Sequence, residues 1–203
     1  GVFDPLLVQI NLRAGHTNFE HGFKIWPGPT ETARARYRIM ITGNSTSMWP
    51  AYPWSRFVGE RLRREGRSVA VWNGAGKGHS SAQELLRVVR DAPGIHPDLI
   101  LSLSGICDIG HLVTARGRPF QHKYGRVLLD LVAAAGIDAA SAPEIEDRGS
   151  PAQIWLRNQR LLHLLARRAG IDHVTFLQPV MGFGAFDPSP EEQEMFRRKA
   201  GVI

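Results

Sequence analysis

Four short apolar segments recur along the chain, separated by segments whose apolar residues have helical spacing. The apolar segments are rich in β-branched and aromatic residues and are bounded by Gly, Pro and Asn, which predicts buried strands. These strands are expected at 37–42, 68–72, 98–103 and 171–177. Helices are expected at 53–65, 81–92, 126–135, 151–168 and 190–199. The alternation predicts an α/β protein with a parallel sheet and helices on both faces.

The expected helix at 81–92 has a clear amphipathic pattern. Ser80 or Ser81 is a good N-cap, and Pro93 with Gly94 is expected to end the helix. Its apolar stripe, the side that an amphipathic helix normally turns to the core, consists of Ala82, Leu85, Leu86 and Val89.

Residues 1–36 have no clear period and are rich in Pro, Gly, His and Asn. We expect an irregular segment packed on the domain, with a short strand at 6–10. Residues 37–203 form the α/β domain. The sequence contains no internal repeat, no low-complexity tract and no linker between domains.

Composition excludes several classes of protein. The 203 residues carry a net charge of +6. The arginines gather near the C-terminal ends of predicted helices, where cations interact favourably with the negative end of the helix dipole. Aromatic residues are not interleaved with the basic ones, so no nucleic-acid partner is expected. No apolar run is long enough to span a membrane. Cys107 is the single cysteine, so no intrachain disulfide forms, and the sequence favours neither cytoplasm nor export.

The segment 37–47, Y-R-I-M-I-T-G-N-S-T-S, contains the first candidate for chemistry. It predicts a strand that ends in a Gly–Asn–Ser turn. A serine on a sharp turn at the carboxyl end of a strand is a common place for an acyl-transfer nucleophile, and this serine is Ser45. The alternative is that Ser45 caps the following helix.

Three motifs in order resemble the SGNH (GDSL-type) hydrolase family, in particular its bacterial branch with a G-x-S-T-[ST] turn. The first is T-G-N-S-T-S. The second is Asn73 with Gly78 and the pair Ser80–Ser81, and the third is G-I-C-D at 105–108. The resemblance covers about residues 18–179. It implies a flavodoxin-like, doubly wound sheet, an ester substrate that is a small molecule or a carbohydrate, and no metal or organic cofactor.

The resemblance also implies the roles of single residues. Ser45 would attack an ester carbonyl, and the backbone N–H groups of Ser45 and Gly78 would stabilise the oxyanion. Asn44, Asn73 and His79 are expected to bind substrate.

Two departures from the family pattern affect catalysis. Cys107 stands where the family has an asparagine that donates to the oxyanion, and a thiol is a weaker donor than an amide. The family's closing Asp-x-x-His is also missing after residue 177, and the chain stops before the fifth parallel strand that the resemblance implies. Either the sequence ends short of this part or the protein works without it.

One internal pair has the same spacing as the missing motif. Asp108 and His111 lie three residues apart, directly after the third strand, so His111 could serve as a relocated base. A thiol dyad of Cys107 and His111 is a further alternative.

The glycine-rich segment 73–81 also raises the question of nucleotide binding. A P-loop requires Ser or Thr directly after Gly-Lys, whereas Lys77 is followed by Gly78. The sequence thus does not favour a nucleotide site.

The serious rival to an esterase or acyl transferase is a domain that has kept the family's cleft and binds carbohydrate or a protein partner without turnover. Cys107 and the missing Asp-x-x-His favour this alternative.

Overall fold

The computed structural model describes residues 2–4, 8–10, 19–20, 22–48, 54–109, 150–178 and 189–200. His111 and the helix expected at 126–135 lie outside these residues. A two-stranded antiparallel sheet pairs β1 (Val2–Asp4) with β2 (Val8–Ile10). The main sheet has six strands.

Four parallel strands form the main part of this sheet. They are β5 (Tyr37–Gly43), β6 (Val69–Asn73), β7 (Leu99–Ser104) and β8 (Asp172–Leu177), in the spatial order β6-β5-β7-β8. Each lies within one residue of the strand expected from the sequence. The first of the parallel strands, β5, thus lies between the second and the third, which is the flavodoxin-like, doubly wound order. The predicted fold class is confirmed.

The N-terminal segment contributes two strands that the sequence did not reveal. β3 (Phe19–Glu20) pairs with β4 (Phe23–Trp26), and β4 pairs antiparallel with β6. Phe23 and Ile25 are almost completely buried. The short helix α1 (Pro29–Ala33) then leads into β5. The expectation of an irregular segment is therefore wrong for residues 19–33, because alternate apolar residues of β4 complete the core.

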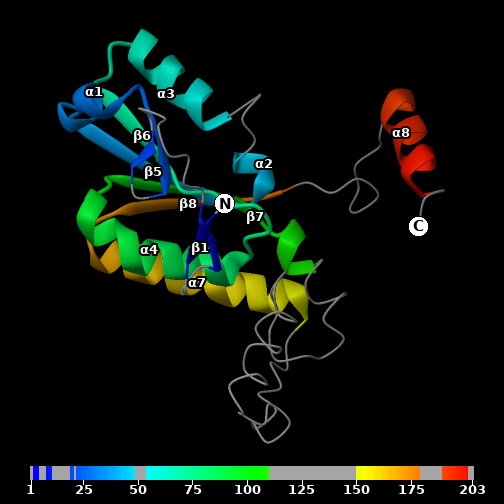
Figure 1. The fold of residues 1–203 in the computed structure, drawn as a ribbon. Coiled ribbons are helices and arrows are strands. Elements are labelled where there is room, and N and C mark those ends of the chain that lie inside the picture. The colour runs from blue at the N-terminus through cyan, green and yellow to red at the C-terminus, as the bar shows by residue number, and fades with distance from the viewer. Residues whose placement is uncertain are drawn as a thin grey trace, which may run out of the picture.

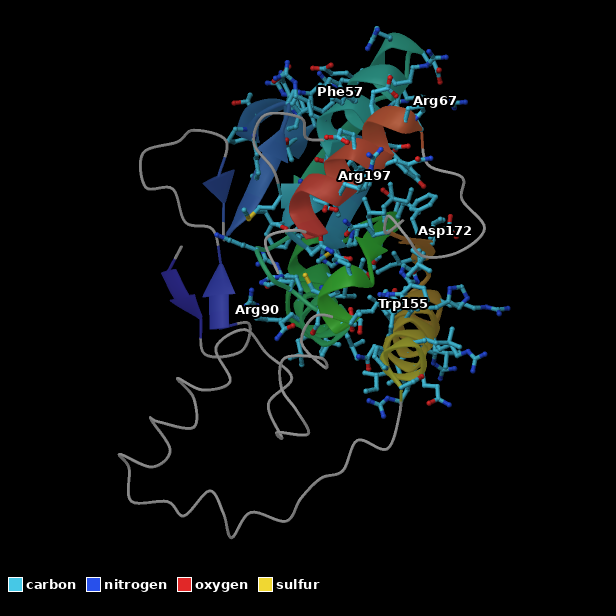
Figure 2. All side chains as sticks on the ribbon, turned by 90° about the vertical axis from the view of Figure 1, so that its right-hand side faces the viewer. Phe57, Arg67, Arg90, Trp155, Asp172 and Arg197 are labelled. Atoms are coloured by element: carbon cyan, nitrogen blue, oxygen red, sulfur yellow. The ribbon has the colours of Figure 1, made fainter. Side chains whose placement is uncertain are left out.

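Helices cover both faces of the sheet (Figure 1). On one face, α3 (Trp54–Arg64) packs over a core that includes Ile39, Ile41 and Val71. On the other, α4 (Ser81–Ile95) and α7 (Pro151–Arg168) enclose a core around Met40 and Ile100. Figure 2 shows α7, with Trp155, and α3, with Phe57, on opposite sides of the sheet. No helix in the described part of the chain is both long and apolar enough to cross a bilayer.

Two short or separate helices complete the fold. α2 (Ser45–Met48) follows β5 directly, and α8 (Pro190–Ala200) lies apart from the layers in Figure 1.

The buried face of α4 differs from the predicted stripe. Leu86 and Val89 are exposed, whereas Glu84 and Arg87 are buried. The predicted stripe is therefore wrong for Leu86 and Val89, whereas Leu85 packs against the core. Glu84 is buried because Thr42 donates a hydroxyl to it, and Arg87 because it packs over Phe23. Ser80 is the N-cap, as one of the two expected caps, but the helix continues through Pro93 to Ile95.

Candidate active site

The carboxyl ends of β5 and β7 mark the point where the chain's winding reverses. From β5 the chain passes to β6 on one side, and from β6 it crosses back to β7 on the other. The loops that leave β5 and β7 therefore diverge, and in doubly wound sheets this divergence is where ligands bind. Ser45 and the turn at 105–109 both lie here, as the sequence predicts.

The turn that carries Ser45 depends on Gly43. This residue has φ 139°, and a Cβ atom there would lie 2.6 Å from the carbonyl oxygen of Leu103 and 2.7 Å from Oγ of Ser47. Only glycine adopts such a conformation without strain and fits against the neighbouring strand. The strand can therefore end at Gly43, and α2 can begin two residues later at Ser45.

Asn44 closes this turn from within. It is completely buried. Its Oδ1 accepts from the backbone N–H of Thr46 at 2.9 Å, and its carbonyl oxygen accepts from the N–H groups of Ser47 and Met48. The N–H group of Ser45 is not among those that Asn44 engages. Asn44 thus shapes the turn around Ser45, and its predicted contact with substrate stays a prediction.

The loop after β6 is bonded to the same turn. Asn73 is buried, and its Nδ2 donates to the carbonyl of Ser47 at 2.8 Å and to Oγ of Ser55 at 2.9 Å. The backbone N–H of Gly76 donates to the carbonyl of Gly43 at 3.0 Å. The first two motifs are therefore in direct contact, and Asn73 holds them together.

Gly78 and His79 lie further along this loop. Gly78 has φ 77°, in the left-handed region that favours glycine. The ring of His79 is buried at 2% exposure, and a Cβ on Gly76 would lie 2.2 Å from it. His79 therefore packs against the glycine backbone of its own loop.

Cys107 and Asp108 lie on a helical turn at 106–109, directly after β7. Cys107 is partly buried. Asp108 is buried, and both of its carboxylate oxygens accept from the backbone N–H of Ser81 at 3.1 Å, with a further short hydrogen bond from the Ser81 hydroxyl. The Asp108 carboxylate thus joins the third motif to the start of α4.

A cluster of buried polar side chains lies beneath these loops, between the sheet and α4. Oγ1 of Thr42 donates to Oε2 of Glu84 at 3.2 Å and lies 2.6 Å from Oγ of Ser102. Glu84 is completely buried, and this burial, followed by the charge of Asp108, raises the pKa of its carboxyl from 4.5 to about 8. Glu84 is therefore neutral at pH 7, and its burial does not place a negative charge between the sheet and α4.

The polar cluster continues to β8 and α7. Nε2 of His173 lies 3.0 Å from Oγ1 of Thr175, which in turn donates to Oε1 of Gln159 at 2.8 Å. Burial, with the charge of His163 as a lesser cause, lowers the pKa of His173 from 6.5 to about 4. Nε1 of Trp155 donates to Oγ of Ser104 at 2.9 Å. His173 is therefore neutral at pH 7, and the hydrogen bonds of Thr175 and Ser104 tie the sheet to α7.

Gln178 was not expected from the sequence, although it contacts the nucleophile turn. Its Oε1 accepts from Nδ2 of Asn44 at 2.8 Å, and its Nε2 donates to Oγ1 of Thr46 at 2.9 Å. A single polar residue between a strand and Pro179 gives no signal by itself. The polar cluster had a readable signal, because Ser102 and Ser104 alternate with leucines and so share one face of β7.

The structure thus brings together Ser45, Asn44, Asn73 and Gly76, while Asp108 faces α4. Within the described ranges, no three His, Cys, Asp or Glu side chains gather as metal ligands would. The predicted pairing of Asp108 with His111 cannot be placed, since His111 lies outside those ranges.

No family model matches the sequence, and no curated protein is significantly similar to it. Solved structures with a similar fold include an acetylxylan esterase from Geobacillus stearothermophilus, with 15% identity and a TM-score of 0.39 over 69% of this chain and 76% of that chain. TesA has 19% identity and a TM-score of 0.43 over 81% of this chain and 71% of TesA. A hydrolase from the metagenome of Lake Arreo, Spain, has 18% identity and a TM-score of 0.40 over 69% and 77%.

These structures include an esterase and a hydrolase, the class that the three motifs resemble. At such identities and TM-scores the likeness carries no argument about chemistry. The function proposed below rests on the residues of this chain.

Proposed function

We propose that this protein is a serine-dependent carboxylic ester hydrolase or acyl transferase with Ser45 as the nucleophile. The observation that carries the proposal is the turn Gly43–Asn44–Ser45. It lies at the switch point of the sheet and is held by Asn73 and by the loop that carries Gly78. Such rigid support is what a nucleophile needs, because the attacking oxygen must be kept in line with the carbonyl carbon.

The proposed reaction has two steps. Oγ of Ser45 attacks the ester carbonyl carbon and loses its proton to a general base, and the oxyanion accepts from the N–H groups of Ser45 and Gly78. Collapse of the tetrahedral intermediate breaks the bond to the alcohol, which leaves with the proton from the base. Water, or an acceptor alcohol, then attacks the acyl-serine and releases the acid or a new ester.

His111 is the general base that the sequence offers. Asp108 accepts from Ser81 at the start of α4, and its two carboxylate oxygens can still accept from a further donor. We assign Asp108 also to support of the loop after β7. His111, with Asp108 three residues before it, is the base in this proposal.

Cys107 sets the expected efficiency. In the family pattern its position supplies a third oxyanion donor, which the thiol replaces poorly. Loss of one such donor typically costs about 2.7–4 kcal/mol, or a factor of a hundred to a thousand in kcat. We therefore expect slow turnover. The substrate class, an ester of a small molecule or a carbohydrate, rests on the resemblance alone.

The alternative function is binding of carbohydrate or a protein partner without turnover. The feature that favours it is Cys107, whose thiol stands where the resembled family pattern has an amide donor to the oxyanion.

Hydrolysis of p-nitrophenyl acetate tests the proposal. The chain is compared with Ser45→Ala and with a control, Ser68→Ala, which changes an exposed serine at the opposite end of β6. We expect turnover that is lost in Ser45→Ala and retained in Ser68→Ala. Turnover that is equal in all three would contradict the proposal, and absence of turnover in all three would favour the binding domain.

A further inference from the structure

Gln178 contacts the nucleophile turn with both polar atoms of its side-chain amide. Its Oε1 accepts from Asn44 Nδ2 at 2.8 Å, and its Nε2 donates to Thr46 Oγ1 at 2.9 Å. Asn44 and Thr46 are the two residues on either side of Ser45. Since an amide group is planar and rigid, the two bonds together restrict both flanks of Ser45 at once.

The backbone of Gln178 is itself fixed. Its N–H donates to the carbonyl of Ser104 at 2.7 Å, which continues the ladder between β8 and β7 by one residue. β7 lies between β8 and β5, so the side chain reaches across the carboxyl end of β7 to the turn after β5.

Gly105 permits this close approach. It has φ 112°, and a Cβ there would lie 2.6 Å from Cδ1 of Leu177. Its positive φ favours glycine, and the missing Cβ leaves room for the Leu177 side chain at the end of β8, directly before Gln178.

We propose that Gln178 is a positioning residue, which holds Ser45 in the orientation for attack by bonding Asn44 and Thr46 together from β8. The inference rests on the proposed function as far as catalysis is concerned, whereas the restraint on the turn stands on geometry alone. Gln178 does not touch the reacting atoms in this account.

The variant Gln178→Met tests the proposal, because methionine has a similar size and no amide. Gln178→Glu is the conservative variant, since one carboxylate oxygen can accept from Asn44 and the other from the Thr46 hydroxyl. Thr175→Val is the matched control on the same strand. It removes the contacts of the Thr175 hydroxyl with Gln159, at 2.8 Å, and with His173, at 3.0 Å, neither of which lies on the nucleophile turn.

Two measurements are made on the full chain. Steady-state hydrolysis of p-nitrophenyl acetate should show kcat lowered about tenfold or more in Gln178→Met with KM within about twofold, as expected for a misplaced nucleophile. Gln178→Glu should recover most of this loss, and Thr175→Val should leave kcat near that of the parent. Amide hydrogen exchange should show faster exchange at Thr46, Ser47 and Met48 in Gln178→Met, with α4 unchanged.

The outcomes separate this proposal from the proposed function. If the parent lacks Ser45-dependent turnover and Gln178→Met still shows faster exchange in the turn, the restraint by Gln178 is supported and the esterase is contradicted. Unchanged exchange in Gln178→Met overturns the positioning role whatever the activity. In an active parent, unchanged kcat despite faster exchange overturns it as well.

Discussion

The side-chain amide of Asn73 donates a 2.8 Å hydrogen bond to the carbonyl of Ser47, and so connects the end of β6 to the turn that carries Ser45. The same nitrogen donates to Oγ of Ser55 at the start of α3, and Oδ1 accepts from the N–H of Ala75. One buried residue thus joins three segments around the proposed nucleophile.

Replacement of Asn73 should therefore destabilise the protein. Asn73→Leu leaves the Ser47 carbonyl and the Ala75 N–H without their partner, and each buried unsatisfied group costs about 1–3 kcal/mol. We expect a loss of about 2–4 kcal/mol in the free energy of unfolding, measured by urea denaturation. Ser68→Ala is the control, since it removes only an exposed 3.3 Å hydrogen bond. A loss in Asn73→Leu no larger than in this control would refute the role given to Asn73.

Two Gly→Ala substitutions should have opposite effects. At Gly43 a Cβ would lie 2.6 Å from a backbone oxygen in a positive-φ conformation, so Gly43→Ala should lower stability by about 3 kcal/mol or prevent folding. Gly94 lies in α4, and nothing lies within 4 Å of its added Cβ. Gly94→Ala should raise stability by up to about 1 kcal/mol, because alanine favours the helix. The midpoint of thermal unfolding of both variants tests these expectations. A Gly43→Ala variant as stable as the parent would contradict the description of the turn.

The buried carboxyl of Glu84 should make stability depend on pH. Its pKa is raised in the folded state from 4.5 to about 8, so between these values the folded protein keeps a proton that the unfolded chain releases. Stability contributed by Glu84 therefore falls as pH rises through this window, with a limiting slope of about 1.4 kcal/mol per pH unit. Glu84→Gln removes this dependence and should be more stable than the parent at pH 9.

His173 contributes the opposite trend at lower pH. Its pKa is lowered in the folded state to about 4, so between pH 4 and 6.5 the unfolded chain binds the extra proton, and stability rises with pH. The two effects oppose each other from about pH 4.5 to 6.5, and only the loss due to Glu84 remains from 6.5 to 8. Urea denaturation of the parent and Glu84→Gln at unit intervals from pH 4 to 9 checks both trends. Parallel pH profiles would mean that Glu84 is not protonated in the folded protein.

An asparagine at position 107, as in the family pattern that the motifs resemble, should increase the proposed activity. Cys107→Asn offers an amide donor on the turn after β7, and gain of an oxyanion donor should raise kcat by up to about a hundredfold. Cys107→Ala adds no donor and should stay near the parent. Equal kcat values for p-nitrophenyl acetate in the two variants would show that position 107 does not face the oxyanion.

The sequence predicted the parallel strands well, because each is a short apolar run between turn residues. It also indicated Ser45, Asn73 and Gly78, whose motifs are local. The antiparallel strand β4 was missed, since the alternation in Phe23–Trp26 is only four residues long. Its place in the sheet depends on pairing with β6, about fifty residues away along the chain.

The polar face of α4 was missed for a different reason. A hydrophobic stripe assumes an apolar partner, whereas Thr42 and Ser102 present hydroxyls to Glu84. Only the sheet register, in which Thr42 pairs with Ser102, reveals that these groups share one buried site. The contact of Gln178 with Asn44 spans 134 residues and could not be predicted from local sequence.

The most direct test of the central claim is covalent labelling of Ser45. The chain is treated with a fluorophosphonate, which reacts with activated serine nucleophiles, and the modified peptide is identified by mass spectrometry, with Ser45→Ala alongside. Stoichiometric phosphonylation at Ser45, lost in Ser45→Ala and slowed in Gln178→Met, is the result that the account predicts. Labelling confined to other serines, or no labelling of the folded chain, would contradict Ser45 as the nucleophile.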